Sequence, residues 1–289
     1  MNRKRVTAVA LAGTLICSPV FSIADGIIAY AADTRFNGEE WYDQIETVEI
    51  NREPAHATFT PYESVEQALS AEQTVFDDVD ETSSPYYQTL NGDWSFKFAQ
   101  RPADREKQVF GGEKTAAYEE NWDTTGWDTI KVPSTIQDQR DENGDFKYEK
   151  PLYVNQIYPW ANYETVNYNT NGTNKPVAPT VNNSIGQYKR TFTIPEDWDG
   201  RQVFVSFQGV ESAFYLYING QRVGYAEDSY TVDEFNITDY LQPGENTIAA
   251  EVYRWSTGSY LENQDFIRLS GIFRDVYLYS KNDVELRDF

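Results

Sequence analysis

Phe214 to Tyr225 reads FYLYINGQRVGY, which is two extended runs joined by Asn219-Gly220. In the first run every second residue is a large aliphatic or aromatic side chain that falls on one face, namely Phe214, Leu216 and Ile218. Asparagine and glycine both tolerate the positive φ angles of a type I′ turn, so this dipeptide between alternating runs is a strong hairpin signal. The stretch therefore predicts an antiparallel β-hairpin.

Further runs with the same two-residue period surround the hairpin. They cover residues 94–98, 188–194, 203–207, 234–237, 246–253 and 275–279. No stretch has the pattern of a long amphipathic helix. Short strands at this spacing, without helices between them, predict an all-β fold, namely an antiparallel β-sandwich of the jelly-roll type. The Asn/Thr/Pro-rich stretch 161–187 is expected to be a long insertion between strands.

The composition excludes several classes of function. The 289 residues include 46 Asp and Glu against 24 Lys and Arg, a formal net charge of −22. Binding to nucleic acid or to an anionic membrane needs a basic face, so neither is expected as a partner. His56 is the single histidine, which excludes a histidine-cluster metal site and disfavours a Ser-His-Asp triad. Aromatic residues make up 15% of the chain, enough to fill a core and to leave rings for contacts with a carbohydrate.

The N-terminus has the layout of a secretory signal peptide. A basic segment, Asn2 to Arg5, precedes the mostly apolar run Val6 to Phe21, and Ala29-Tyr30-Ala31 fits a cleavage site. We therefore expect residues 1–31 to be removed and the mature protein to be secreted or displayed at the cell surface, with no membrane association afterwards. A retained membrane anchor is the alternative. Cleavage would also remove Cys17, the single cysteine, and leave no disulfide.

After the signal, the composition divides the chain into three parts. Residues 32–85 are polar and irregular and are expected to form an N-terminal arm lying across the domain. Residues 86–282 carry the strand pattern and are expected to form the sandwich. Residues 283–289 are expected to begin a linker to domains outside this chain.

Several segments resemble the N-terminal sugar-binding domain of glycoside hydrolase family 2, specifically its β-galactosidases. The resemblance is carried by NREPAH (51–56), LNGDWSF (90–96), WDTIKVPS (127–134), PLYVN (151–155), GVESAF (209–214), RWS (254–256), GSYLE (258–262) and QDFIRLSGIFRDV (264–276). These segments follow one another in the same order as in the family, and together they span residues 50–280. The resemblance implies a jelly-roll, galactose-binding-like fold for this domain.

The resemblance also implies a retaining β-galactosidase mechanism in a longer protein. Such a mechanism uses two carboxylates, a nucleophile and an acid/base. In this family both are glutamates on a (β/α)8 barrel of roughly 250 residues, which would follow an immunoglobulin-like domain. No βα alternation of that kind is present here. We therefore expect no catalytic residue in this chain and no activity from it alone, while the longer protein hydrolyses terminal β-D-galactosides and can be a homo-oligomer.

Two substrate-binding residues follow from the motif match. Asp265 corresponds to the family's aspartate that contacts the galactose 6-hydroxyl and a bound monovalent cation such as Na⁺, and Asn155 to an asparagine that contacts another galactose hydroxyl. The alternative is that Asp265 caps a turn and Asn155 satisfies backbone groups of a loop. The implied partners are a β-galactoside and the catalytic barrel.

We expect the other polar and aromatic residues of these motifs to have structural roles and not to bind substrate. Thr257 and Glu227 stand where well-known members carry other polar groups, so no divalent-metal site is assigned here, although the resemblance allows Mg²⁺ in the longer protein. Trp255 is interpreted as a core residue rather than a sugar platform. Three arginines are interpreted as buried ion-pair partners that hold loops, namely Arg254, Arg268 and Arg274.

Two other functions remain open from the sequence. A stand-alone carbohydrate-binding module would have the same fold but would not need the QD segment that faces the barrel in the family. A β-glucuronidase or β-mannosidase of the same family would share this domain, and the PLYVN and QDFIR segments favour galactose over those sugars.

Overall fold

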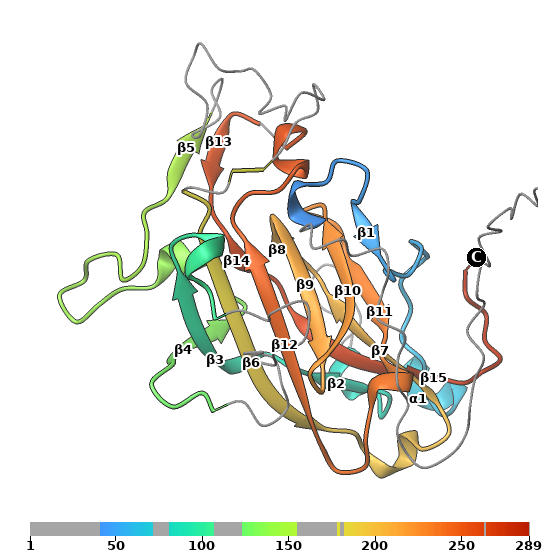
Figure 1. Cartoon of the computed structure of the whole chain (residues 1–289). Helices are drawn as coiled ribbons and strands as arrows, with labels where there is room; N and C mark the ends of the chain where they lie inside the picture. Colours follow the sequence, from blue (N-terminus) through green and yellow to red (C-terminus); the bar gives the residue numbers. More distant parts are fainter. Residues whose placement is uncertain are drawn as a thin grey trace, which may run out of the picture. The chain divides into compact units, whose positions relative to one another are not determined.

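A computed structural model describes residues 41–71, 81–106, 123–154, 178–179, 182–262 and 264–288. These residues form a nearly all-β structure in which the pairings between strands are antiparallel (Figure 1). The all-β prediction is therefore confirmed. In the described residues the longest helix is α1 (Val65–Ser70), and no helix is long and apolar enough to cross a membrane.

The larger of two main sheets has seven strands. Their order is β1 (Glu49–Ile50), β10 (Gln221–Glu227), β9 (Ala213–Ile218), β12 (Glu245–Tyr253), β6 (Ile185–Thr193), β3 (Gly92–Ala99) and β4 (Asp128–Val132). The hairpin predicted at Asn219-Gly220 joins β9 to β10. Both turn residues have positive φ, 50° and 76°, as the type I′ geometry requires.

The second main sheet has four strands, in the order β11 (Asp233–Asn236), β7 (Gln202–Phe207), β15 (Val276–Lys281) and β2 (Tyr87–Thr89). Two short ribbons complete the pairing. One joins β13 (Phe266–Arg268) to β5 (Leu152–Val154), and the other joins β14 (Gly271–Ile272) to β8 (Val210–Glu211).

The core lies between the inner faces of the two main sheets. The larger sheet contributes Trp94, Phe96, Tyr188, Phe214 and Ile248, and the smaller sheet contributes Val205, Phe207, Phe235 and Leu278. Each of these side chains is at most 1% exposed. Alternation along the strands places them there, which is why the two-residue period in the sequence was enough to locate most strands.

The segment expected to be an irregular arm contains short elements in its described part. Residues 41–43 form the 3-10 helix η1 (Trp41–Asp43), β1 pairs with β10, and α1 and η2 (Glu81–Ser83) follow. Trp41 and Tyr42 are each 3% exposed. In the described part of this segment, Trp41 and Tyr42 are therefore packed into the sandwich, and β1 extends its larger sheet. Further 3-10 helices are η3 (Pro102–Asp104), η4 (Ile136–Asp138), η5 (Glu196–Trp198), η6 (Thr238–Tyr240) and η7 (Gly258–Tyr260).

Two sequence predictions concern residues that lie wholly or mostly outside the described part of the chain. The expected signal peptide, residues 1–31, lies outside the described residues. So does most of the insertion expected at 161–187, although its last residues belong to β6, which begins at Ile185.

Candidate functional site

The β5–β13 ribbon carries Asp265 at one end. Phe266, the residue after Asp265, pairs with Val154, and Ile267 pairs with Tyr153. Asp265 itself is exposed, and its Oδ1 accepts a hydrogen bond from the Tyr153 hydroxyl. Asn155 lies outside the described residues. Its neighbour Val154 is nevertheless the last residue of β5, so two segments far apart in the sequence meet at this point of the ribbon.

Arg268 fixes the ribbon to the sandwich. Its side chain is 1% exposed, and its Nε lies 2.8 Å from Glu211 Oε1. Its Nη2 lies 3.3 Å from Glu262 Oε2, and its Nη1 donates to the Glu262 carbonyl oxygen. Glu262 in turn accepts hydrogen bonds from the backbone and hydroxyl of Ser229, at 2.7 and 2.8 Å. One buried guanidinium therefore joins β13 to β8, to the turn after η7 and to the loop after β10.

The carboxyl groups around Arg268 are structural. Burial raises the pKa of the Glu211 carboxyl to about 7, and the Arg268 guanidinium opposes that rise. A retaining glycosidase also needs two carboxylates close together, about 5 Å apart, but it needs them open to a sugar. Glu211 and Glu262 are instead committed to the same arginine. They are ion-pair partners and not a catalytic pair.

The RWS motif before this turn is also packed internally. Trp255 is 3% exposed, and its backbone N–H and carbonyl are both hydrogen bonded to the side chain of Asn183, each at 2.9 Å. Arg254 Nη1 lies 2.5 Å from Glu149 Oε2. The core interpretation of Trp255 is confirmed, and so are the ion pairs of Arg254 and Arg268. For Arg274 the ion-pair prediction is wrong, because this exposed side chain donates to the carbonyl oxygens of Gln208 and Tyr230.

Glu227 is a buried carboxyl group near the same turn. Its oxygens accept hydrogen bonds from the Tyr225 hydroxyl at 2.6 Å, from the Thr257 hydroxyl at 3.0 Å and from the Gly258 N–H at 2.5 Å. These donors are neutral, and desolvation by burial raises the pKa of Glu227 to about 7. The group ties the end of β10 to the turn at Thr257, whose N–H donates to the Tyr42 carbonyl oxygen.

Metal ligands are sparse in the described part of the chain. It contains no group of three or more His, Cys, Asp or Glu side chains arranged to hold a metal. The donors around Glu227 come from the protein itself. Asp265 can offer one carboxylate oxygen beside the one that Tyr153 occupies. An oxygen ligand suits a hard cation, but the described residues show only this one candidate ligand at the ribbon.

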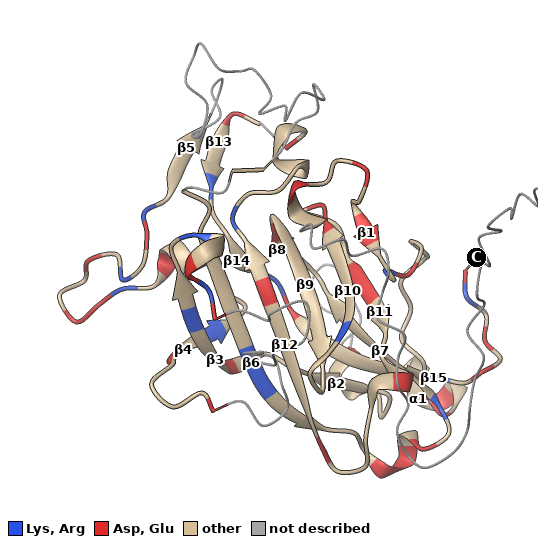
Figure 2. Cartoon of the chain, in the orientation of Figure 1, with Lys and Arg blue, Asp and Glu red and all other residues tan. Residues whose placement is uncertain are grey.

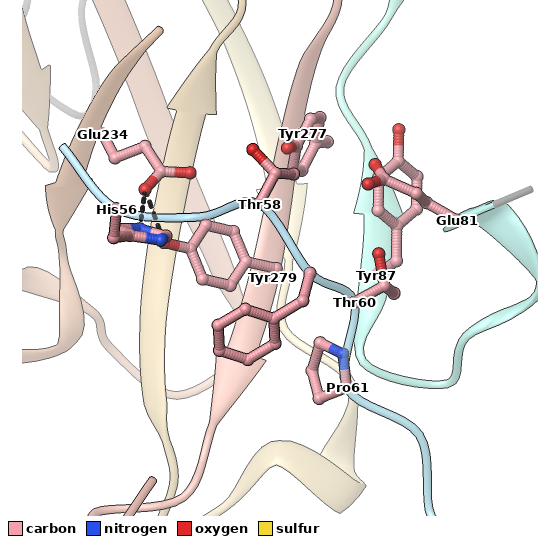
Figure 3. Close-up of a pocket in the computed structure, with 10 residues that line it drawn as sticks. His56, Thr58, Thr60, Pro61, Glu81, Tyr87, Glu234, Tyr277 and Tyr279 are labelled. Carbon is pink, nitrogen blue, oxygen red and sulfur yellow. Dashed lines mark hydrogen bonds and ion pairs between the residues drawn. The ribbon is translucent and has the colours of Figure 1, made fainter. Parts of the chain in front are cut away.

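His56 lies in a different place, on the outer face of the four-stranded sheet (Figure 3). Its Nε2 is 2.7 Å from Glu234 Oε2, which also accepts a hydrogen bond from the Tyr279 hydroxyl at 3.0 Å. The hollow that these residues line with Tyr87 and Tyr277 has a volume of about 20 Å³. That is room for about one water molecule, and the bond of His56 to Glu234 anchors this part of the chain to the sheet.

Charge is distributed unevenly over the strands (Figure 2). The basic side chains of β3, β4 and β6 include Lys97, Lys131 and Lys189, and two of them pair with acidic groups, Lys97 with Glu106 and Lys131 with Asp93. The described ion pairs thus neutralise much of the basic charge.

The family model described as "Glycosyl hydrolases family 2, sugar binding domain" matches residues 87–282. The chain belongs to glycosyl hydrolase family 2. A β-galactosidase of Priestia megaterium is 49% identical over 250 residues, which are 86% of this chain and 21% of that protein. The β-galactosidase of Halalkalibacterium halodurans is 40% identical over 248 residues, with the same coverage of 86% and 21%.

This family 2 chain spans about a fifth of the length of these relatives. Among solved structures, a β-glucuronidase of Bacteroides uniformis is 25% identical and covers 68% of this chain and 18% of its own, with a TM-score of 0.45.

Sequence reasoning missed Tyr153, the side chain that contacts Asp265. It is the third residue of the PLYVN segment, two positions before Asn155. The usable signal was the two-residue period of a strand, which puts alternate residues on one face. To use this signal, one would need to know that PLYVN pairs with QDFIR. Neither segment by itself determines the register of that pairing.

Proposed function

We propose that this chain is the N-terminal portion of an exported β-galactosidase, and that its β5–β13 ribbon helps to form the galactose pocket of the longer protein. The observation that carries the proposal is the 49% identity to a β-galactosidase over 250 residues. The family match over residues 87–282 includes the PLYVN and QDFIR segments of the ribbon. The proposed substrate is a terminal β-D-galactoside.

The described geometry supports a role in binding rather than in bond cleavage. Asp265 is exposed at the end of a ribbon that a buried arginine holds in place. Beside it, Tyr153 and Ile267 form a cross-strand pair whose side chains are 59% and 54% exposed. An exposed apolar pair next to a polar binding group suits a surface that another domain covers. We propose that this domain is the catalytic barrel of the longer chain.

We propose that the barrel and this domain contribute different groups to the active site. The barrel supplies the two carboxylates of a retaining mechanism, and this domain supplies hydroxyl contacts that orient galactose. Asp265 would accept a hydrogen bond from a galactose hydroxyl and would contribute one oxygen to a monovalent cation such as Na⁺. Asn155 would contact a second hydroxyl. Holding the sugar in one orientation contributes to rate without any chemistry in this chain.

Substrate specificity of the longer protein tests the proposal. The complete reading frame that contains this chain is expressed, and kcat/KM is measured on p-nitrophenyl β-D-galactoside, β-D-glucuronide and β-D-mannoside. The proposal expects the galactoside to be preferred. A preference for the glucuronide or mannoside would assign the protein to another activity of the family.

Hydrolysis of p-nitrophenyl β-D-galactoside by the 289-residue chain alone is measured in parallel with hydrolysis by the longer protein. The isolated chain is expected to release no more p-nitrophenol than a heat-inactivated control. Turnover by the isolated chain would contradict the division of labour. Galactose binding by the isolated chain, with no longer hydrolase in the reading frame, would favour a stand-alone carbohydrate-binding module.

A further inference from the structure

Tyr153 and Asp265 are held together by the pairing of β5 with β13. Tyr153 lies opposite Ile267, so Asp265 is its diagonal neighbour on the same face of the ribbon. The Tyr153 hydroxyl donates a hydrogen bond to Asp265 Oδ1. Because 112 positions of sequence separate the two residues, this contact depends on the ribbon and not on a local turn.

On the opposite face of the ribbon, Arg268 is held by buried ion pairs. Arg268 points away from the Tyr153 face, is 1% exposed and is bonded to Glu211 and Glu262. The backbone that carries Asp265 is therefore fixed three residues away by a buried ion-pair network. What remains free is rotation of the exposed Asp265 side chain, and a hydrogen bond from Tyr153 restricts that rotation.

We propose that Tyr153 is a positioning residue, which holds one carboxylate oxygen of Asp265 so that the other is presented to the sugar hydroxyl. This inference rests on the proposed function and adds a residue to it. A carboxylate has two oxygens that can each accept hydrogen bonds. With Oδ1 committed to Tyr153, Oδ2 is the atom that remains for the ligand. Fixing it in advance lowers the ordering cost of binding.

The test removes one oxygen atom. In the longer enzyme, Tyr153→Phe keeps the ring and deletes the hydroxyl. We expect kcat/KM on p-nitrophenyl β-D-galactoside to fall about 5-fold, mainly through a higher KM, because the sugar is held in both the ground state and the transition state. The substitution keeps the ring of Tyr153 and removes only its hydroxyl, so the melting temperature should change little.

A matched control deletes a hydroxyl nearby. Tyr230 is 39% exposed and contacts Phe266 and Phe273 through its ring. Tyr230→Phe should retain the parental KM. A rise in KM of the same size in both variants would mean that the ribbon tolerates no loss of a hydroxyl, which would overturn a specific role for Tyr153.

A double-mutant cycle separates positioning from direct contact. Asp265→Asn keeps the shape of the side chain but weakens its acceptor. Once Asp265 is replaced, Tyr153→Phe should have little further effect, since two residues that act through one interaction are not additive. Equal fold-losses in the parental and Asp265→Asn backgrounds would show that Tyr153 acts independently, and would overturn the inference.

The outcomes distinguish this inference from the proposed function. If Asp265→Asn is impaired and Tyr153→Phe is not, the positioning role is wrong and the galactosidase proposal stands. If both variants are parental, Asp265 does not bind the sugar and the inference falls with it. If the parental longer protein does not hydrolyse β-galactosides, the proposed function itself fails, and the inference, which rests on it, fails as well.

Discussion

Arg268 Nε lies 2.8 Å from Glu211 Oε1, and the two side chains are 1% and 5% exposed. A guanidinium buried to this degree must be paired, because leaving an unpaired charge in the interior is costly. The pair connects the ribbon that carries Asp265 to β8 of the sandwich. Stability of the domain and placement of Asp265 are thus coupled through one residue.

Replacing Arg268 should destabilise the domain strongly. Arg268→Met leaves Glu211 without its ion-pair partner in a buried site, and we expect the free energy of unfolding to fall by about 3–5 kcal/mol. Urea unfolding of the 289-residue chain measures this. Arg274→Met is the matched control, because Arg274 is exposed, and its loss should stay within about 0.5 kcal/mol. Equal effects of the two substitutions would contradict the assigned role of the Arg268 network.

The buried carboxyl of Glu227 predicts a pH dependence of stability. Burial raises its pKa in the folded state from 4.5 to about 7. The folded state therefore binds the proton more tightly than the unfolded state, so the contribution to stability is complete below pH 4.5 and is lost as the pH rises through 7. The loss is up to about 3 kcal/mol for this group.

Glu227→Gln should remove that part of the pH dependence. Denaturation midpoints measured from pH 4.5 to pH 8 should fall less steeply in the variant than in the parent. Glu196→Gln makes the same change of charge at an exposed glutamate and should leave the slope as it is. A slope that is identical in all three proteins would show that Glu227 does not titrate in this range.

Most of the sandwich could be predicted because its signals are local. Every second residue of β7, β9 and β12 faces the core between the sheets, a pattern set within each strand, and Asn219-Gly220 carries its own turn preference. The ribbon site could not be predicted in this way. Its decisive contact joins Tyr153 to Asp265 through a strand register, and register depends on how distant segments meet.

The segment before residue 51 was beyond local prediction for a related reason. β1 has two residues and η1 has three, too few to show a period. Their order comes from tertiary contacts, such as the Trp41 ring stacked on Tyr215 at 5.5 Å between centroids. The family resemblance supplied Asp265 and Asn155, and the sequence also indicated that Arg268 is a buried ion-pair partner. Its partners Glu211 and Glu262, and the packing role of Glu227, needed the structure.

The packing of Trp41 predicts that this early segment stabilises the sandwich. Trp41 is 3% exposed, and the Arg222 guanidinium lies 5.0 Å from its ring centre. Trp41→Ala should therefore cost about 3–5 kcal/mol in urea unfolding. Val65→Ala, in α1 at 70% exposure, should change stability little. A Trp41 variant as stable as the parent would mean that the segment merely rests on the surface.

The basic, apolar and small-residue pattern of residues 1–31 predicts cleavage on export. N-terminal sequencing of protein recovered from the culture medium should begin near Ala32 or Asp33. Recovery of the intact Met1 end in the exported protein would contradict a cleaved signal and favour a retained anchor.

The most direct test of the central claim is the steady-state kinetics of Asp265→Ala in the longer enzyme, measured beside its thermal melt. A hydrogen bond to a charged group contributes roughly 1.5–3 kcal/mol, so kcat/KM on a β-galactoside should fall about 10- to 100-fold while the melting temperature is unchanged. Asn155→Ala should cost less, since a neutral contact contributes roughly 0.5–1.5 kcal/mol. A lower melting temperature with parental kcat/KM for Asp265→Ala would contradict the account and make Asp265 a structural residue.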